Sequence, residues 1–92
     1  MAITYDPAKR DWTLRERGLD FEDAAKVFAD LTIDIPDLRR AYGEPRINTV
    51  GHLGGRMLIV CWTPRGDDRR IISMRRANER EKARYGKRFE QS

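Results

Sequence analysis

The sequence Arg56-Met57-Leu58-Ile59-Val60-Cys61-Trp62-Thr63 is apolar almost throughout. A strand without polar alternation is buried on both faces, so this stretch predicts the central strand of a sheet. The preceding pair Gly54-Gly55 suits the positive φ angles of a tight hairpin turn. Residues Arg46–Gly51 are therefore expected to form a neighbouring strand.

The other expected strands lie on either side of this hairpin. A second turn, Arg65–Asp68, leads into a strand from Arg69 to Arg75. Upstream, Thr32–Ile35 alternates as a half-buried strand does, and Pro36 ends it or confines it to an edge. Ile3–Tyr5 predicts a short edge strand. Because short turns join consecutive strands, we expect an antiparallel sheet of about four strands in addition to the N-terminal strand.

Two short helices are expected before the sheet. Asp6-Pro7 is typical of a helix start, and Gly18 is a suitable terminator for that helix. Asp20 predicts the cap of a second helix. Its apolar residues recur at helical spacing and are expected in the core: Phe21, Ala24, Ala25 and Phe28.

A last helix is expected after the sheet. Asn78 and Glu81 form a possible capping box, and the helix would extend to about Phe89, interrupted or ended near Gly86. With few apolar residues, it would lie loosely on the sheet or dock on another molecule. Helices separated from a run of strands indicate the α+β class, here in a single domain spanning residues 1–92.

Basic residues concentrate in the C-terminal third. Charged residues make up 37% of the chain, and the net charge is +4. Residues 64–92 contain ten Lys and Arg against five Asp and Glu, whereas residues 1–63 contain nine against ten. A charge run is often a solvated helix face, but this one begins in the last predicted strand. The pattern therefore favours a surface that binds nucleic acid.

Several other functions lack support in the sequence. Cys61, the only cysteine, is expected to be a buried and inert thiol in a reducing cytosol. His52, the only histidine, is expected in a turn, and no Cys–His cluster suggests zinc. No segment reaches the length of a membrane span, and Met1–Tyr5 does not resemble a signal peptide. We expect a cytoplasmic protein without a metal or cofactor.

The candidates for chemistry are arginines on or near the sheet. They are Arg46, Arg56, Arg65, Arg69, Arg70, Arg75 and Arg76. Strict alternation along the last strand gives two faces, one with Arg70, Ile72, Met74 and Arg76 and the other with Arg69, Ile71, Ser73 and Arg75. Converging guanidinium groups would bind an RNA backbone and stabilise negative charge in a transition state. For any single arginine, an exposed head group with a packed stem is the simpler interpretation.

RNA cleavage also requires a base for the 2′-hydroxyl and an acid for the leaving oxygen. Glu44 is the preferred base because it opens the strand that carries Arg46, although pairing with an arginine would explain it equally. Possible acids are Lys9, Tyr42 and Tyr85, and the sequence does not choose among them. The candidate catalytic residues are thus Arg75, Arg76, Arg46, Glu44 and Lys9. Further candidates for RNA binding are Arg65, Arg69, Arg70, Arg80 and Arg84.

Three groups of residues form a pattern along nearly the whole chain. The N-terminal group is Tyr5-Asp6-Pro7-Ala8-Lys9, Leu14, Gly18, Phe21, Ala24, Phe28 and Asp30. The C-terminal group is Ile71-Ile72-Ser73-Met74-Arg75-Arg76-Ala77, Glu81 and Tyr85. Between them lie Glu44, Arg46 and Gly51. In the order and spacing of these residues the sequence resembles the BrnT family of toxins, which carries a Glu-Arg element and a glycine at the positions of the middle group.

The resemblance implies a RelE-like ribonuclease fold and cleavage of RNA that blocks translation. It also implies a partner, a BrnA-like antitoxin with a ribbon-helix-helix DNA-binding part, in a complex that represses its own operon. Operator DNA would be contacted only through the antitoxin. We therefore expect a toxin that acts as a metal-independent endoribonuclease on mRNA and forms a hetero-oligomer with its antitoxin.

One segment departs from the family pattern. Where the family usually has Asn, two residues, Lys, His and Gly, this chain has Thr13, Glu16, Arg17 and Gly18. Arginine is effectively never deprotonated, so any proton transfer by that histidine would be lost. The alternative function is therefore a non-catalytic RNA-binding module that acts through the basic C-terminal region.

The last helix is also the expected contact with the partner. Tyr85 and Phe89 would be costly to leave bare together, and a small chain has little core to cover them. An acidic antitoxin segment, disordered alone, would fold over these aromatics and the arginines and occupy the RNA site.

Overall fold

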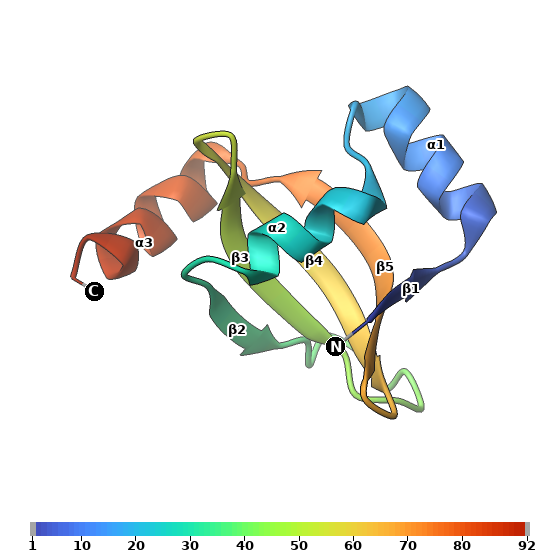
Figure 1. Cartoon of the computed structure of the whole chain (residues 1–92). Helices are drawn as coiled ribbons and strands as arrows, with labels where there is room; N and C mark the ends of the chain where they lie inside the picture. Colours follow the sequence, from blue (N-terminus) through green and yellow to red (C-terminus); the bar gives the residue numbers. More distant parts are fainter. Residues whose placement is uncertain (1, 92) are drawn as a thin grey trace.

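Five strands form one mixed sheet in the computed structural model, which describes residues 2–91 (Figure 1). Their bounds are β1 Ile3–Tyr5, β2 Ile33–Pro36, β3 Ile47–Leu53, β4 Arg56–Arg65 and β5 Asp68–Arg76. The spatial order is β1-β5-β4-β3-β2. β2 to β5 pair antiparallel, and β1 pairs parallel with β5. The α+β class and the central position of the apolar strand are confirmed. The fifth strand is the predicted N-terminal edge strand.

The helices begin and end where the local sequence indicates. They are α1 Pro7–Arg17, the 3-10 turn η1 Phe21–Asp23, α2 Ala24–Phe28 and α3 Glu79–Glu90. Asp6 caps α1 by accepting from the Ala8 amide at 3.0 Å, and Gly18 ends it at φ 69°. Asp20 caps η1 through the Glu22 amide. None of the described helices is both long and apolar enough to cross a membrane.

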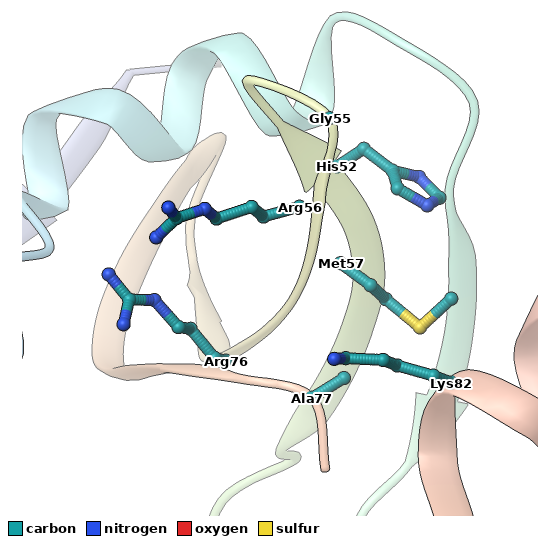
Figure 2. Close-up of a pocket in the computed structure, with 7 residues that line it drawn as sticks. All are labelled: His52, Gly55, Arg56, Met57, Arg76, Ala77 and Lys82. Atoms are coloured by element: carbon teal, nitrogen blue, oxygen red, sulfur yellow. The ribbon is translucent and has the colours of Figure 1, made fainter. Parts of the chain in front are cut away.

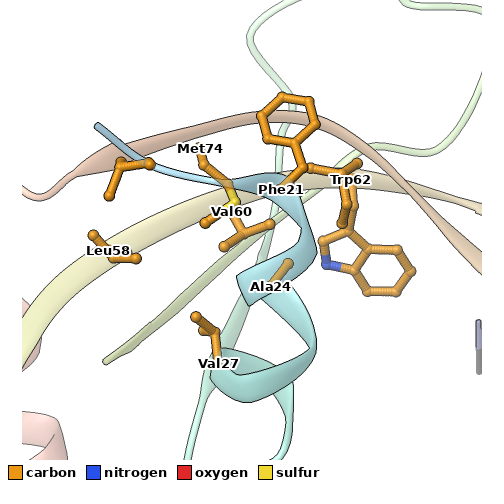
Figure 3. Packing of buried hydrophobic residues seen from close by; sticks show 9 residues of the cluster. Phe21, Ala24, Val27, Leu58, Val60, Trp62 and Met74 are labelled. Carbon is orange, nitrogen blue, oxygen red and sulfur yellow. The ribbon is translucent and has the colours of Figure 1, made fainter. Parts of the chain in front are cut away.

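The main core lies between one face of the sheet and the segment η1–α2, which crosses the front of the sheet in Figure 1. Phe21, Ala24 and Val27 are fully buried there. Figure 3 shows them beside side chains of β4 and β5, namely Leu58, Val60, Trp62 and Met74. We call this side of the sheet the covered face.

α3 packs on one end of the opposite face. Tyr85 and Phe89 are half-buried against a cluster that includes Val50 and Ile59. Phe89 also meets the His52 ring edge-on, with 4.7 Å between ring centroids. His52 therefore belongs to β3 rather than to a turn, and the two aromatics are not left bare. The helix also continues through Gly86, because its capping box and its packing outweigh the cost of one glycine.

The predicted faces of the last strand are wrong beyond its middle. The residues that pair across β4 and β5 are Cys61 with Ser73 and Trp62 with Ile71, so Ile72 has no partner in β4. This extra residue is a β-bulge, which breaks the period of two. Ile71 and Met74 consequently share the main core, although strict alternation separates them.

The bulge also changes which arginines lie together. Ile71 and Met74 point to the covered face, so their alternating neighbours Arg69 and Arg76 lie on that side. Arg70 and Arg75 lie on the opposite side, which we call the open face. The predicted pairings of Arg70 with Arg76 and of Arg69 with Arg75 are therefore corrected.

Candidate functional site

The middle of the open face is a short row of polar side chains from three adjacent strands. Asn48 of β3 is registered with Cys61 of β4, and Cys61 with Ser73 of β5. Cys61 is 7% exposed, whereas Asn48 and Ser73 are half-exposed. α2 lies on the other face and α3 covers only the end near Met57, so this row stays accessible.

Three cations from different parts of the chain lie near Cys61, the middle residue of this row. Arg46, Arg39 and Lys9 all lie close enough to Cys61 to lower the pKa of its thiol. Burial, followed by the negative charge of Asp37, outweighs them and raises that pKa above its usual range. The thiol therefore stays protonated, which agrees with the prediction that it is inert. The fold brings positive charge from α1 and from the loop between β2 and β3 to one place on the sheet.

Arg46 is held by its neighbours in the loop before β3. Its guanidinium lies 4.0 Å from the centre of the Tyr42 ring and pairs with Glu44 at 3.4 Å. Glu44 also accepts from Arg65 at 3.2 Å, so this carboxylate is shared by two arginines. The hydroxyl of Thr63 in β4 donates to the Pro45 carbonyl at 2.5 Å. This hydrogen bond connects the loop before β3 to β4.

Arg75 extends from β5 on the open face and is fixed by α3. Its two terminal nitrogens donate to both carboxylate oxygens of Glu81, at 2.7 and 2.9 Å. Glu81 also accepts from the Asn78 amide at 2.9 Å as part of the capping box. The hydrogen bonds from Arg75 are the main reason why the pKa of Glu81 lies below its usual range. This pair holds the Arg75 guanidinium in a defined orientation.

The other predicted site residues are distributed around the molecule. Lys9 is exposed on α1 and lines a pocket of about 380 Å³ with Ser73. Arg76 lies on the covered side, away from Arg46. Arg80 and Arg84 are exposed on α3, and Arg65 ends β4.

Arg69 has a packing role in this fold. Its guanidinium carbon lies 3.9 Å from the centre of the Phe28 ring and 5.0 Å from that of Trp62. Its Nε atom is buried without a hydrogen-bond partner among the described residues. Arg70, by contrast, is registered with Thr63 near the end of the open face that lies farthest from α3.

Arg17, at the segment that departs from the expected family pattern, is bound to the backbone of the sheet. It donates to the Met74 carbonyl at 2.8 Å and lies over the Trp12 ring. β1 pairs only with residues 69–71 of β5, so Arg17 satisfies a carbonyl beyond the end of that pairing. The contact is structural, since a guanidinium does not exchange protons near neutral pH.

Sequence reasoning missed Asn48 and Arg39 as members of the site. Asn48 could have been found, because it alternates with Arg46 along the same predicted strand. No sequence pattern indicated Arg39. Its position depends on Asp37 in the same irregular loop, whose carboxylate it contacts at 2.9 Å. Among residues 2–91, no group of three His, Cys, Asp or Glu side chains is arranged to hold a metal ion.

Comparison with known families gives a match over most of the chain. The family described as "Ribonuclease toxin, BrnT, of type II toxin-antitoxin system" matches residues 5–81. This range contains the polar row, Lys9, Arg46, Arg75 and Glu81. A comparison with curated proteins found no match.

Proposed function

The chain belongs to the BrnT family, the ribonuclease toxins of type II toxin–antitoxin systems, and we propose that it cleaves mRNA on its open face and so inhibits translation. Membership of a type II system implies a protein antitoxin as partner. The observation that supports the site is the gathering of Arg46, Arg39 and Lys9 around Cys61, with Arg75 on the same face. This charge would hold the scissile phosphate over Asn48 and Ser73.

The proposed reaction is an internal displacement at phosphorus. The RNA 2′-oxygen forms a bond to the adjacent phosphorus, and the bond from phosphorus to the 5′-oxygen of the next nucleotide breaks. The products are a 2′,3′-cyclic phosphate and a 5′-hydroxyl. A base takes the proton from the 2′-hydroxyl, and an acid gives one to the leaving oxygen. No further reactant is needed.

The roles follow from the positions of the side chains. Arg75 and Arg46 stabilise the additional negative charge at phosphorus, because both present guanidinium groups on the open face. Glu44 is the proposed base and Lys9 the proposed acid. Glu44 must exchange its contacts with Arg46 and Arg65 for the substrate, since both of its carboxylate oxygens are engaged in these ion pairs.

The test of this assignment uses Arg75 and its carboxylate partner separately. We expect R75A to lower the cleavage rate by about a hundredfold or more, because an oriented transition-state donor is lost. R75K is expected to recover little of that rate, since lysine cannot reproduce the guanidinium fork. K26A, which removes an exposed charge paired with Asp23 on the same helical segment, is the matched control.

The variant E81Q distinguishes a catalytic role of Arg75 from a purely structural one. If Arg75 serves only to hold α3, E81Q and R75A will reduce activity equally. If Arg75 acts on phosphate, E81Q will lower the activity less than R75A does, because the guanidinium is still present and one side-chain oxygen can still accept from it. Circular dichroism checks that each variant is folded, and cleavage is measured on RNA in EDTA. Uncut RNA with the folded wild-type chain, together with normal growth of bacteria that express it without antitoxin, would overturn the ribonuclease assignment.

One observation favours the alternative of a non-catalytic RNA-binding module. Glu44 is held in ion pairs, and Arg17 in place of the family histidine is bound to a backbone carbonyl. That module would bind RNA with strong salt dependence and leave it intact. An RNA cut at one junction, and protected there by a 2′-deoxy substitution, would exclude it, because the attacking hydroxyl is then missing.

The remaining parts of the proposal concern the cellular setting. We propose that the antitoxin is BrnA-like, carries a ribbon-helix-helix domain and brings the complex to operator DNA, and that the toxin acts in the cytoplasm. A short neighbouring reading frame that encodes such a protein, and its co-purification with this chain, would support this setting.

A further inference from the structure

A second basic site lies at the end of the sheet next to α3. A pocket of about 480 Å³ is formed there by the β3–β4 hairpin, the end of β5 and the first turns of α3. Its lining residues are His52, Gly55, Arg56, Met57, Arg76, Ala77 and Lys82 (Figure 2). None of the seven is acidic, and three carry a positive charge.

The two arginines of this pocket lie close together because of how β4 pairs with β5. Leu58 pairs with Arg76, and Arg56 stands two residues before Leu58 in β4. Arg56 and Arg76 are therefore diagonal neighbours on the same side of adjacent strands. Figure 2 shows both guanidinium groups extending to the same side of the hairpin.

The positive charge of the two arginines is not neutralised by any acidic residue of the described chain. Neither Arg56 nor Arg76 forms an ion pair with another residue of the described chain, and both are exposed. Lys82 pairs with Glu79 at 3.0 Å, but the two side chains are 50% and 91% exposed, so that contact is weak and readily exchanged. Neighbouring like charges repel, and a bound anion would remove this cost.

The pocket is connected to the open face through consecutive residues of β5. Arg75 and Arg76 both line a smaller pocket of about 340 Å³, together with Arg17, Leu19 and one acidic residue, Glu16. A strand of RNA bound at Arg75 can thus continue past Arg76 to Arg56 and Lys82. A chain of phosphates fits this path better than a single small anion does.

We propose that Arg56, Arg76 and Lys82 form a subsite for one backbone phosphate of the RNA, outside the phosphate that is cleaved. The inference rests on the proposed function in taking RNA as the ligand. The subsite increases the affinity for RNA and orients the RNA chain. It confers no sequence specificity, because only the phosphodiester is contacted.

The experiment measures binding without cleavage. The probe is a single-stranded RNA of about twelve nucleotides with 2′-O-methyl groups, which lacks the attacking hydroxyl. Its affinity for the full chain is measured at several salt concentrations. The test variant is R56A/K82A. The control K26A/K87A loses the same net charge from two exposed residues outside these pockets, Lys26 on α2 and Lys87 on α3.

Loss of one phosphate contact should reduce the slope of log affinity against log salt by about 0.7. We expect this change in R56A/K82A, together with a roughly tenfold weaker affinity. The control should keep the wild-type slope. An unchanged slope and affinity in folded R56A/K82A would overturn the subsite. So would unchanged RNA binding with loss of antitoxin binding, since the pocket would then be a protein contact.

The same experiment keeps this inference separate from the ribonuclease assignment. If unmodified RNA remains uncut but the slopes differ as expected, the subsite stands and the proposed catalysis fails. If the wild type cuts RNA and the slopes do not differ, only the subsite fails.

Discussion

Asp37 shows how a single buried charge organises the loop beside the open face. Its side chain is only 1% exposed, and its carboxylate accepts hydrogen bonds from two nitrogens of the Arg39 fork and from the Tyr42 hydroxyl. These hydrogen bonds, led by those from Arg39, hold the pKa of Asp37 well below its usual range. The same contacts place Tyr42 under the guanidinium of Arg46. The position of a candidate catalytic arginine thus depends on a residue outside the sheet.

Replacement of Asp37 tests this dependence. D37N keeps the size of the side chain but removes its charge, and we expect the free energy of unfolding to fall by about 1–3 kcal/mol. RNA cleavage should also weaken, because Tyr42 and Arg46 lose their support. Urea unfolding of D37N measures the effect, with D67N in the exposed β4–β5 turn as control. Equal stability of the two variants would contradict the role given to Asp37.

The pH dependence of stability follows from the same carboxylate. A group whose pKa is lowered by folding stabilises the native state above its unfolded pKa, and this contribution is lost as the pH falls. The wild type should therefore lose stability as the pH drops below about 4, the ordinary range of an aspartate. D37N should lose less over that interval, and thermal unfolding at several pH values compares the two.

At the scale of elements, the close approach of α2 to β3 depends on the absence of one side chain. A Cβ atom at Gly51 would lie 2.6 Å from a methyl group of Val27 and 3.2 Å from one of Thr32. Val27 is fully buried, so it has little room to move. Gly51 therefore allows the short helix to pack directly on the strand. At Gly86 in α3, a Cβ atom would have no other group within 4 Å, so this glycine serves no such purpose.

Alanine at these two glycines should act in opposite directions. G51A is expected to reduce the free energy of unfolding by about 1–3 kcal/mol, because the core becomes overpacked. G86A is expected to increase it by about 0.5–1 kcal/mol, since alanine favours the helix. Chemical denaturation of both variants checks the signs. A neutral G51A would mean that α2 shifts without cost.

The docking of α3 changes the basis for the predicted partner contact. Tyr85 and Phe89 were expected to be bare and to require the antitoxin, but they already pack against the sheet cluster around Val50 and Ile59. Their contact with the antitoxin stays a prediction. The exposed arginines of α3 and of the open face are now the stronger reason to expect an acidic partner segment there.

For the whole molecule, the fold joins cations from distant segments into one basic surface. Lys9 comes from α1, Arg46 from the loop before β3, and Arg75 from the end of β5. RNA and an acidic antitoxin segment would be attracted to the same surface. The antitoxin would then bind tightly to this surface and inhibit the toxin by occluding the RNA site.

A competition experiment decides between occlusion and inhibition from a remote face. The wild-type chain is mixed with the uncleavable RNA and increasing amounts of antitoxin, and the release of RNA is followed by fluorescence anisotropy. Occlusion predicts complete displacement of the RNA. A stable complex of toxin, RNA and antitoxin would show that the antitoxin acts elsewhere.

The order of the elements and the central strand could be predicted from the sequence because their causes are local. Residues 57–62 are apolar without interruption, Asp6 and Gly18 delimit a helix, and Asn78 begins another. The resemblance of residues along nearly the whole chain was likewise enough to predict the family, which the match over residues 5–81 confirms.

Only the tertiary structure decided which side chains meet. The bulge at Ile72 depends on pairing with β4, and it moves Arg76 away from Arg70 and towards Arg56. Similarly, the gathering of Lys9 and Arg46 near Cys61 results from contacts between segments far apart in the chain. Patterns of period 2 or 3.6 report how a segment folds locally. They carry no information about the register between strands or the packing of helices on a sheet, and those contacts form the site.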